Sequence, residues 1–166
     1  MAALLEKVIA AVVETLNLAE VPAAPAYVKQ PLDDTAAFVR VGVKRVSEAY
    51  GVGAQYLGIL HDAEHGDREV YGLQCEIELS VDVYAPFAQD NGALVCTELF
   101  DSAALAIGAV EGLKLKALSC GAPAPEETTG MFLLRGSMLC SAWLVAEQSG
   151  EAGTFTDFIL KGELKK

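Results

Sequence analysis

One stretch constrains the fold of this chain more than any other: it runs from Gly72 to Tyr84 and reads GLQCEIELSVDVY. Its apolar residues alternate without a break with polar ones, which is typical of a strand with one buried and one solvated face. At about 3.4 Å per residue the strand would extend on the order of 40 Å, beyond the usual length in globular proteins. Pro86 follows it, and Asp90-Asn91-Gly92 opens a helical segment. We therefore expect a long strand feeding a helix to be the central unit of the fold.

The segments before this strand predict a helix and a second strand. Apolar residues recur at helical spacing over residues 2–19, and the prolines of 22–31 then impose an extended connector, with a turn at Asp33-Asp34. Alternation returns over 38–46 and breaks register near Lys44-Arg45, which indicates a bulge or a bend at the sheet edge. Five glycines between 51 and 72 predict short strand pieces that are joined by a mobile loop over 61–68 and enter the central strand as a long hairpin.

The second half of the chain is expected to add a helix and three strands. The helix runs from about Asn91 to Gly108, and a strand over 113–120 leads to an exposed loop at 121–130, which is either a contact arm or a hairpin tip. Residues 131–145 are apolar on both alternate sets, which predicts a strand covered on both faces by helices or by a neighbouring copy. A turn at 148–153 and a strand over 155–164 close the chain. The apolar side of the helix is expected to consist of Leu94, Val95, Leu99, Ala103, Ala106 and Ile107.

These elements predict one α+β domain over residues 1–166. It should be a mostly antiparallel β-sheet with two helices packed on one face and an extended long hairpin. A chain of 166 residues is long enough to bury a proper core as one domain.

Charge and cysteine content exclude several classes of protein. The chain has 12 basic and 23 acidic residues and a formal charge of −11, which argues against a surface that holds nucleic acid and fits either a solvated acidic surface or one that DNA passes without sticking. The four cysteines are widely spaced, so we expect buried free thiols in a reducing cytoplasm instead of a structural zinc site. Neither a signal peptide nor a membrane span is recognised, so no membrane partner is expected. The cysteines are Cys75, Cys96, Cys120 and Cys140.

The sharpest chemical motif is His61-Asp62-Ala63-Glu64-His65, an H-x-x-E-H pattern that is the inverted zinc-peptidase signature. On a helix both imidazoles would bind a metal and Glu64 would activate water, with Glu98 or Asp101 as a possible third ligand. Gly58 and Gly66 leave room for only about two helical turns, without apolar neighbours to bury the motif. We favour a solvated acidic loop and keep a small metal-dependent hydrolase as the alternative.

Other candidate chemistry is weaker. Glu76, Glu78 and Asp82 share the polar face of the central strand, but a catalytic carboxylate pair needs burial to split its pKa values. Ser119-Cys120-Gly121 has no histidine placed to activate a nucleophile, and Gly51-Val52-Gly53 lacks the third glycine of a dinucleotide fingerprint. We therefore predict no catalytic, cofactor-binding or metal-binding residues and no cofactor, and we expect the chain not to be an enzyme.

Several short motifs together resemble a known family. They are Tyr56-Leu57-Gly58 before an acidic loop, Tyr71-Gly72 at the start of the long strand, Asp82-Val83-Tyr84-Ala85-Pro86 at its end, and the closing Phe155-Thr156-Asp157-Phe158. In this order, over most of the chain, they are similar to small virion proteins encoded in the tail modules of prophages and contractile phage-like particles. Within that group the chain most resembles the tail terminator, or tail-completion, proteins.

The resemblance implies a virion structural protein without catalytic residues. It implies a ring, typically of six subunits, that caps the tail tube, joins it to the neck or head, and in contractile systems holds the last sheath ring. The implied partners are sister subunits, tail tube and sheath proteins, and neck or connector proteins, with DNA only passing through the lumen. The protein would be made in the host cytoplasm and end in the virion tail. A head–tail connector or a tail tube component is the alternative.

An acidic lumen would repel phosphate and let DNA slide through such a ring. Two groups of acidic residues are candidates for its lining. They are Asp62, Glu64, Asp67 and Glu69, or Glu126 and Glu127.

Overall fold

The computed structural model describes residues 2–29, 35–48, 55–64, 66–146 and 155–158. Two helices and an eight-stranded, mostly antiparallel sheet confirm the predicted α+β class. The helices are α1 (Ala2–Leu18) and α2 (Gly92–Gly108). The strands are β1 (Ala23–Pro25), β2 (Phe38–Glu48), β3 (Gln55–Asp62), β4 (Gly66–Pro86), β5 (Lys114–Cys120), β6 (Ala124–Glu126), β7 (Met131–Ala146) and β8 (Phe155–Phe158).

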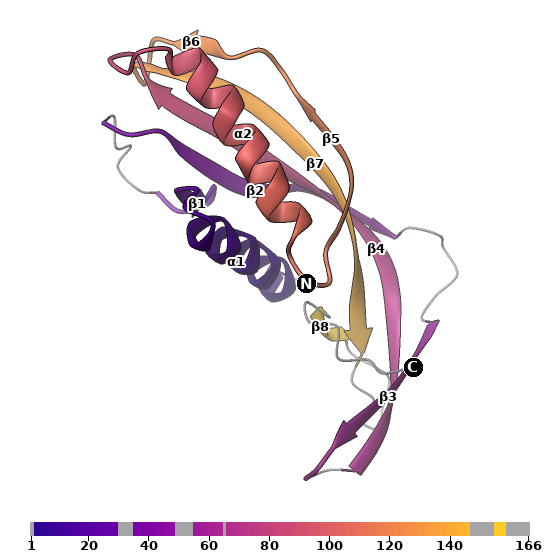
Figure 1. The fold of residues 1–166 in the computed structure, drawn as a ribbon. Coiled ribbons are helices and arrows are strands. Elements are labelled where there is room, and N and C mark those ends of the chain that lie inside the picture. Colours follow the sequence, from indigo (N-terminus) through magenta and orange to yellow (C-terminus); the bar gives the residue numbers. More distant parts are fainter. Residues whose placement is uncertain (1, 30–34, 49–54, 65, 147–154, 159–166) are drawn as a thin grey trace.

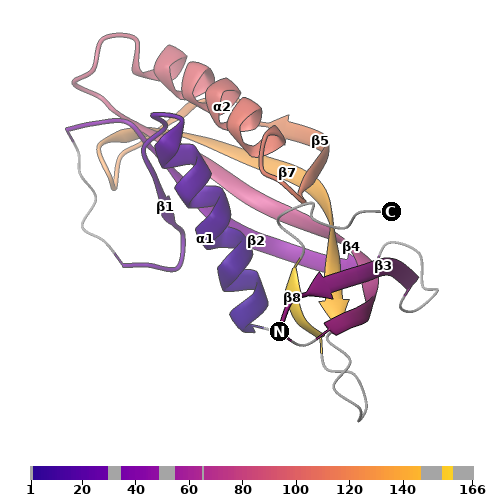
Figure 2. The ribbon, with the colours of Figure 1, turned by 60° about the horizontal axis from the view of Figure 1, so that its bottom comes forward.

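The sheet has the strand order β1-β2-β4-β7-β5, with the long strands β4 and β7 at its centre. Both helices lie on the same face of this sheet (Figures 1 and 2). The predicted alternation of β4 is confirmed, because its residues from Cys75 to Val83 are fully buried at every second position under the helices. The core also takes Val8, Val12 and Leu16 from α1, Cys96, Phe100 and Ile107 from α2, and Met138 and Cys140 from β7.

The central strand is longer than its sequence pattern predicts. β4 has 21 residues, and its first part, Gly66–Gly72, pairs with β3 as a hairpin before the strand passes between β2 and β7. The long hairpin is therefore confirmed, and it extends beyond the helix-covered part of the sheet (Figure 1). The predicted loop over 61–68 is wrong, because His61 and Asp62 end β3 and β4 begins at Gly66. Gly66 has a φ of 79°, which lets the chain reverse over a short turn.

The strand before the hairpin has the bulge that the sequence indicates. The register between β2 and β4 shifts between Val43 and Arg45, so Val46 pairs with Ile77. The connector after α1 is extended over β1, which pairs with β2 in parallel, and a turn follows at 26–27. The predicted turn at Asp33-Asp34 lies outside the described residues.

The apolar side predicted for α2 is partly wrong. Leu94 is 55% exposed, whereas Cys96 and Phe100 are buried. The ring of Phe100 fits here because Gly136 on β7 lacks a side chain: a Cβ at Gly136 would meet this ring and would lie 2.7 Å from the carbonyl oxygen of Val81. The buried side lies opposite the polar residues Glu98 and Asp101, and Leu94 lies with these polar residues.

The segment 121–130, predicted to be an exposed loop that is a contact arm or a hairpin tip, is largely exposed and is part of a hairpin. Its middle forms β6, which pairs with residues Met131–Leu133 of β7, so the segment is a short hairpin with a turn at 127–130. Strand β5 lies where 113–120 predicts it, but most of its residues are exposed. The last strand is described only over Phe155–Phe158, and the predicted turn at 148–153 and residues 159–164 lie outside the described residues.

Candidate assembly surface

The face of the sheet opposite the helices is covered by no element that the structure describes, and we call it the open face. Here the outward residues of β2, β4, β7 and β5 form a mixed surface of charged and apolar side chains. Prominent members are Phe38, Arg40, Lys44, Arg45, Glu76, Glu78, Asp82, Tyr84, Lys114, Lys116, Arg135, Leu139 and Trp143. The predicted covering of β7 on both faces is met by the helices on one side, and on the other side Leu139 and Trp143 are half-buried on the open face.

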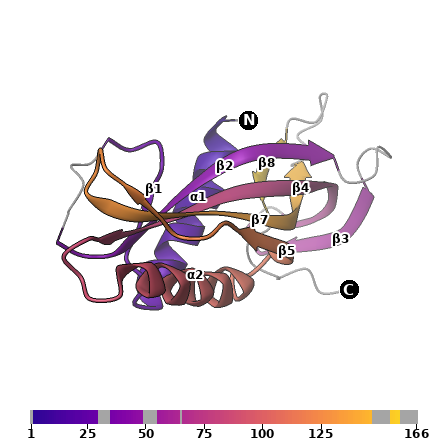
Figure 3. The same ribbon diagram turned by 90° about the horizontal axis from the view of Figure 1, so that it is seen from above.

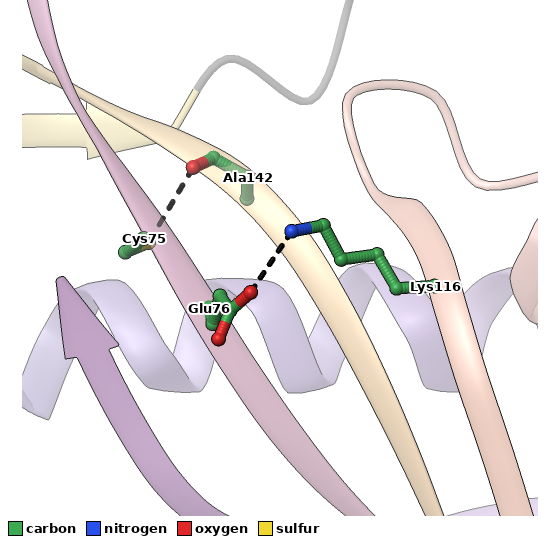
Figure 4. Close-up of polar contacts among 4 residues, drawn as sticks. All are labelled: Cys75, Glu76, Lys116 and Ala142. Atoms are coloured by element: carbon green, nitrogen blue, oxygen red, sulfur yellow. Dashed lines mark hydrogen bonds and ion pairs between the residues drawn. The ribbon is translucent and has the colours of Figure 1, made fainter. Parts of the chain in front are cut away.

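The acidic residues of the open face lie on its central strand, and their basic partners lie on the flanking strands. The Nζ atom of Lys116 on β5 donates to the Oε1 atom of Glu76 across β7 at 2.9 Å (Figure 4). Glu78 accepts a 2.8 Å hydrogen bond from the hydroxyl of Ser137, and one of its carboxylate oxygens lies 3.8 Å from Nε of Arg45. Because these side chains remain partly exposed, each ion pair is worth only about 0.2–1 kcal/mol.

The end of the open face near β6 holds a tighter cluster. Asp82 lies between Arg40 and Arg135 in the register of the three strands. Burial raises the pKa of Asp82, and a hydrogen bond from the backbone of Gly136 and the nearby Arg135 and Lys44 oppose that rise. The ring of Phe38 stacks on Tyr84 with centroids 5.1 Å apart, and burial raises the pKa of Tyr84. This end of the face is therefore a packed polar and aromatic cluster.

A hollow of about 340 Å³ adjoins this cluster under the β6–β7 hairpin. Its walls are mostly small and apolar, and the exposed Arg135 stands at its edge. It is lined by Gly121, Ala122, Ala124, Pro125, Glu126, Leu133 and Arg135.

Basic residues outnumber acidic ones on the open face, although the whole chain has a charge of −11. The acidic side chains of β4 are half-buried, whereas Lys44, Lys114 and Arg135 are exposed and form no ion pair within the described part of the chain. The face thus presents positive charge to solvent. Sequence reasoning found the row Glu76, Glu78 and Asp82, but the bases come from three other strands, and only the register brings them together.

The H-x-x-E-H motif does not lie on a helix. His61 ends β3 and Glu64 lies in the turn, while His65 is outside the described residues. The Nδ1 atom of His61 lies 2.6 Å from a carboxylate oxygen of Asp67, and both side chains are exposed. Figure 3 shows β3 beyond the end of α2, the helix that carries the suggested third ligands Glu98 and Asp101. Within the described residues, no group of three or more His, Cys, Asp or Glu could hold a metal ion.

The predicted buried free thiols are confirmed at three of the four cysteines. Cys75, Cys96 and Cys140 are buried, but Cys120 is exposed at the end of β5. Burial raises the pKa of Cys75 and of Cys140 to about 11. The thiol of Cys75 donates to the carbonyl oxygen of Ala142 at 3.5 Å (Figure 4). Ser119 is exposed beside Cys120, and the glycines Gly51 and Gly53 lie outside the described residues.

The two acidic groups suggested for a lumen lie on different hairpins. Asp62, Glu64, Asp67 and Glu69 belong to the β3–β4 hairpin, and Glu126 and Glu127 to the β6–β7 hairpin. Figure 1 shows these hairpins at opposite ends of the sheet. The carboxylate of Glu126 accepts a hydrogen bond from Thr129 at 2.9 Å, which ties it into its own turn.

A scan against protein-family models finds no matching family, and a search of curated proteins finds no match. Neither of the described helices has both the length and the apolar character needed to cross a bilayer.

Proposed function

We propose that this chain is a structural assembly protein of a phage tail or phage-like particle, a tail terminator that works as a closed ring and carries out no reaction. The ring, of six subunits by the family resemblance, caps the tail tube and joins it to the neck or head. Its partners are sister subunits, tube and sheath proteins, and neck proteins, and DNA passes through its lumen. It assembles in the host cytoplasm and remains in the particle.

The observation that carries this proposal is the open face. A sheet that leaves Leu139, Trp143 and the Phe38–Tyr84 stack partly accessible, between charged rows, has surface suited to burial against another protein. The helix-covered side adds the exposed leucines Leu94 and Leu105. A chain with adhesive surfaces on opposite sides suits head-to-tail association, which closes into a ring when the rotation allows.

The first test is the mass of the purified protein, measured by sedimentation over a wide concentration range together with negative-stain imaging. We expect one closed species whose mass is a whole multiple of that of the chain, and ring-shaped particles that bind one end of purified tail tubes. Binding along the tube, or at a portal, would instead identify a tube component or a connector.

A protein that remains monomeric at high concentration, even beside tail tubes, would contradict the proposal. The metal content of the same sample provides the second check. Stoichiometric zinc that is lost in a His65→Ala variant would favour a metal-dependent hydrolase over an assembly role.

A further inference from the structure

Helix α2 has an exposed stripe that complements the open face in charge. Leu94, Glu98, Asp101 and Leu105 follow one another at spacings of four, three and four, so they form one line along the helix. This line is opposite the buried side that contains Phe100, Ala103 and Ile107. Leu94 is 55% exposed and Leu105 is 79% exposed. We call these four residues the α2 stripe.

The acids of the α2 stripe are available for a partner. The carboxylates of Glu98 and Asp101 are exposed and have no partner among the described residues. The acids of the β3–β4 hairpin, by contrast, are engaged within it, because Asp67 contacts His61 and Glu69 accepts a hydrogen bond from Tyr71. The α2 stripe is therefore the acidic and apolar surface best prepared to meet exposed bases.

We propose that the α2 stripe of one copy docks on the open face of a second copy. The leucines then cover Leu139 and Trp143, and the acidic pair meets the exposed base Lys114, which lies opposite Ser141, between these two residues of β7. The stripe spans about 16 Å at 1.5 Å per residue. Leu139 and Trp143 lie roughly 14 Å apart along β7, close to the spacing of the two leucines.

This docking is head-to-tail, because the stripe and the open face lie on opposite sides of the same sheet. Each copy therefore offers one surface of each kind, and the contact repeats from copy to copy until the ring closes. The inference rests on the proposed function and supplies its subunit interface. A nucleic acid is a poorer occupant of the open face, because the carboxylates of Glu76, Glu78 and Asp82 run along its centre.

Reversing the charges on one surface, and then on both surfaces together, tests the interface. The full-length variants Glu98→Lys and Lys114→Glu should each raise the dissociation constant of the assembly about tenfold, and the combined variant should recover most of the loss. A milder variant, K114Q, removes the same charge without introducing a carboxylate and guards against misfolding. The matched control is Glu14→Arg on the exposed side of α1, which should leave assembly unchanged. Sedimentation gives the constants, and circular dichroism confirms folding.

The outcomes separate this inference from the proposed function. Rings that form in every folded reversal variant would overturn the interface and leave the terminator role intact. Rings lost only on reversal of Asp67 and Glu69 would assign the contact to the β3–β4 hairpin, again against this inference. A wild-type protein that stays monomeric beside tail tubes would overturn both. Binding of labelled duplex DNA at physiological salt, lost in K114Q, would assign the open face to nucleic acid instead.

Discussion

Among the single residues, the cysteines show how burial changes the chemistry of a group. Cys75 and Cys140 lie on the helix-covered side of β4 and β7, where the low polarity disfavours a thiolate. Their pKa values are raised to about 11 from an ordinary value of 9.0. These thiols are therefore protonated and inert at neutral pH, whereas Cys120 is exposed.

The same shift predicts how stability changes in alkaline solution. Above pH 9.0 the unfolded chain loses the protons of Cys75 and Cys140, while the folded chain keeps them until about pH 11. The folded state then binds more protons, so the free energy of unfolding must fall as the pH rises through this window, and the full contribution is present below it. Urea unfolding at a series of pH values should show a shallower fall in a C75A/C140A variant. The Cys120→Ala control should keep the wild-type slope, and equal slopes in all three proteins would contradict the assignment.

Among the elements, α2 shows where sequence periodicity stops being informative. Its polar residues Thr97, Glu98, Asp101 and Ser102 lie on one side and mark it as exposed, but Leu94 and Leu105 lie among them and their apolar character alone does not predict this position. On the buried side, Gly136 leaves room for the ring of Phe100 against β7. Leu94 and Leu105 are left in solvent.

This arrangement predicts a large contrast between two truncations in one helix. Phe100→Ala should lower the free energy of unfolding by about 3–5 kcal/mol, because a fully buried ring leaves a cavity behind. Leu105→Ala should change it by less than about 0.5 kcal/mol, because its side chain is exposed. Denaturant unfolding of the two variants measures both values. Similar losses in the two proteins would mean that another side of α2 is buried.

The sequence was sufficient to predict the elements whose pattern extends over many neighbouring residues. The alternation of β4, the bulge at Lys44-Arg45 and the helical spacing of α1 each follow from neighbouring residues, so the class and most strands could be predicted. Strands β1 and β6 have three residues each and exist only through pairing with longer strands, so no local pattern marks them. The charge of the open face depends on the register of four strands, so its candidate site could not be predicted from any one of them.

Across the whole molecule, the backbone amides at the centre of the sheet should be the best protected from hydrogen exchange. Strand β4 has a neighbour on both sides over 75–84, whereas the described part of the β3–β4 hairpin has two strands and mostly exposed side chains. Amide hydrogen exchange by the unassembled protein should therefore be slowest over 75–84 of β4 and its partners in β7, and fast over 59–69. The internal control is the part of β4 that pairs with β2, because it lies in the same strand as residues 66–69. Equal protection along all of β4 would contradict this expectation.

The continuity of β4 also has a mechanical consequence. Strand β4 runs without interruption for roughly 70 Å at 3.4 Å per residue, from the middle of the domain into the β3–β4 hairpin. It contains neither a proline nor a linker before Pro86. The direction of the β3–β4 hairpin is consequently set by the twist of the sheet and not by a hinge. A force applied to the tip of this hairpin would be transmitted along the covalent backbone of β4 into the centre of the domain.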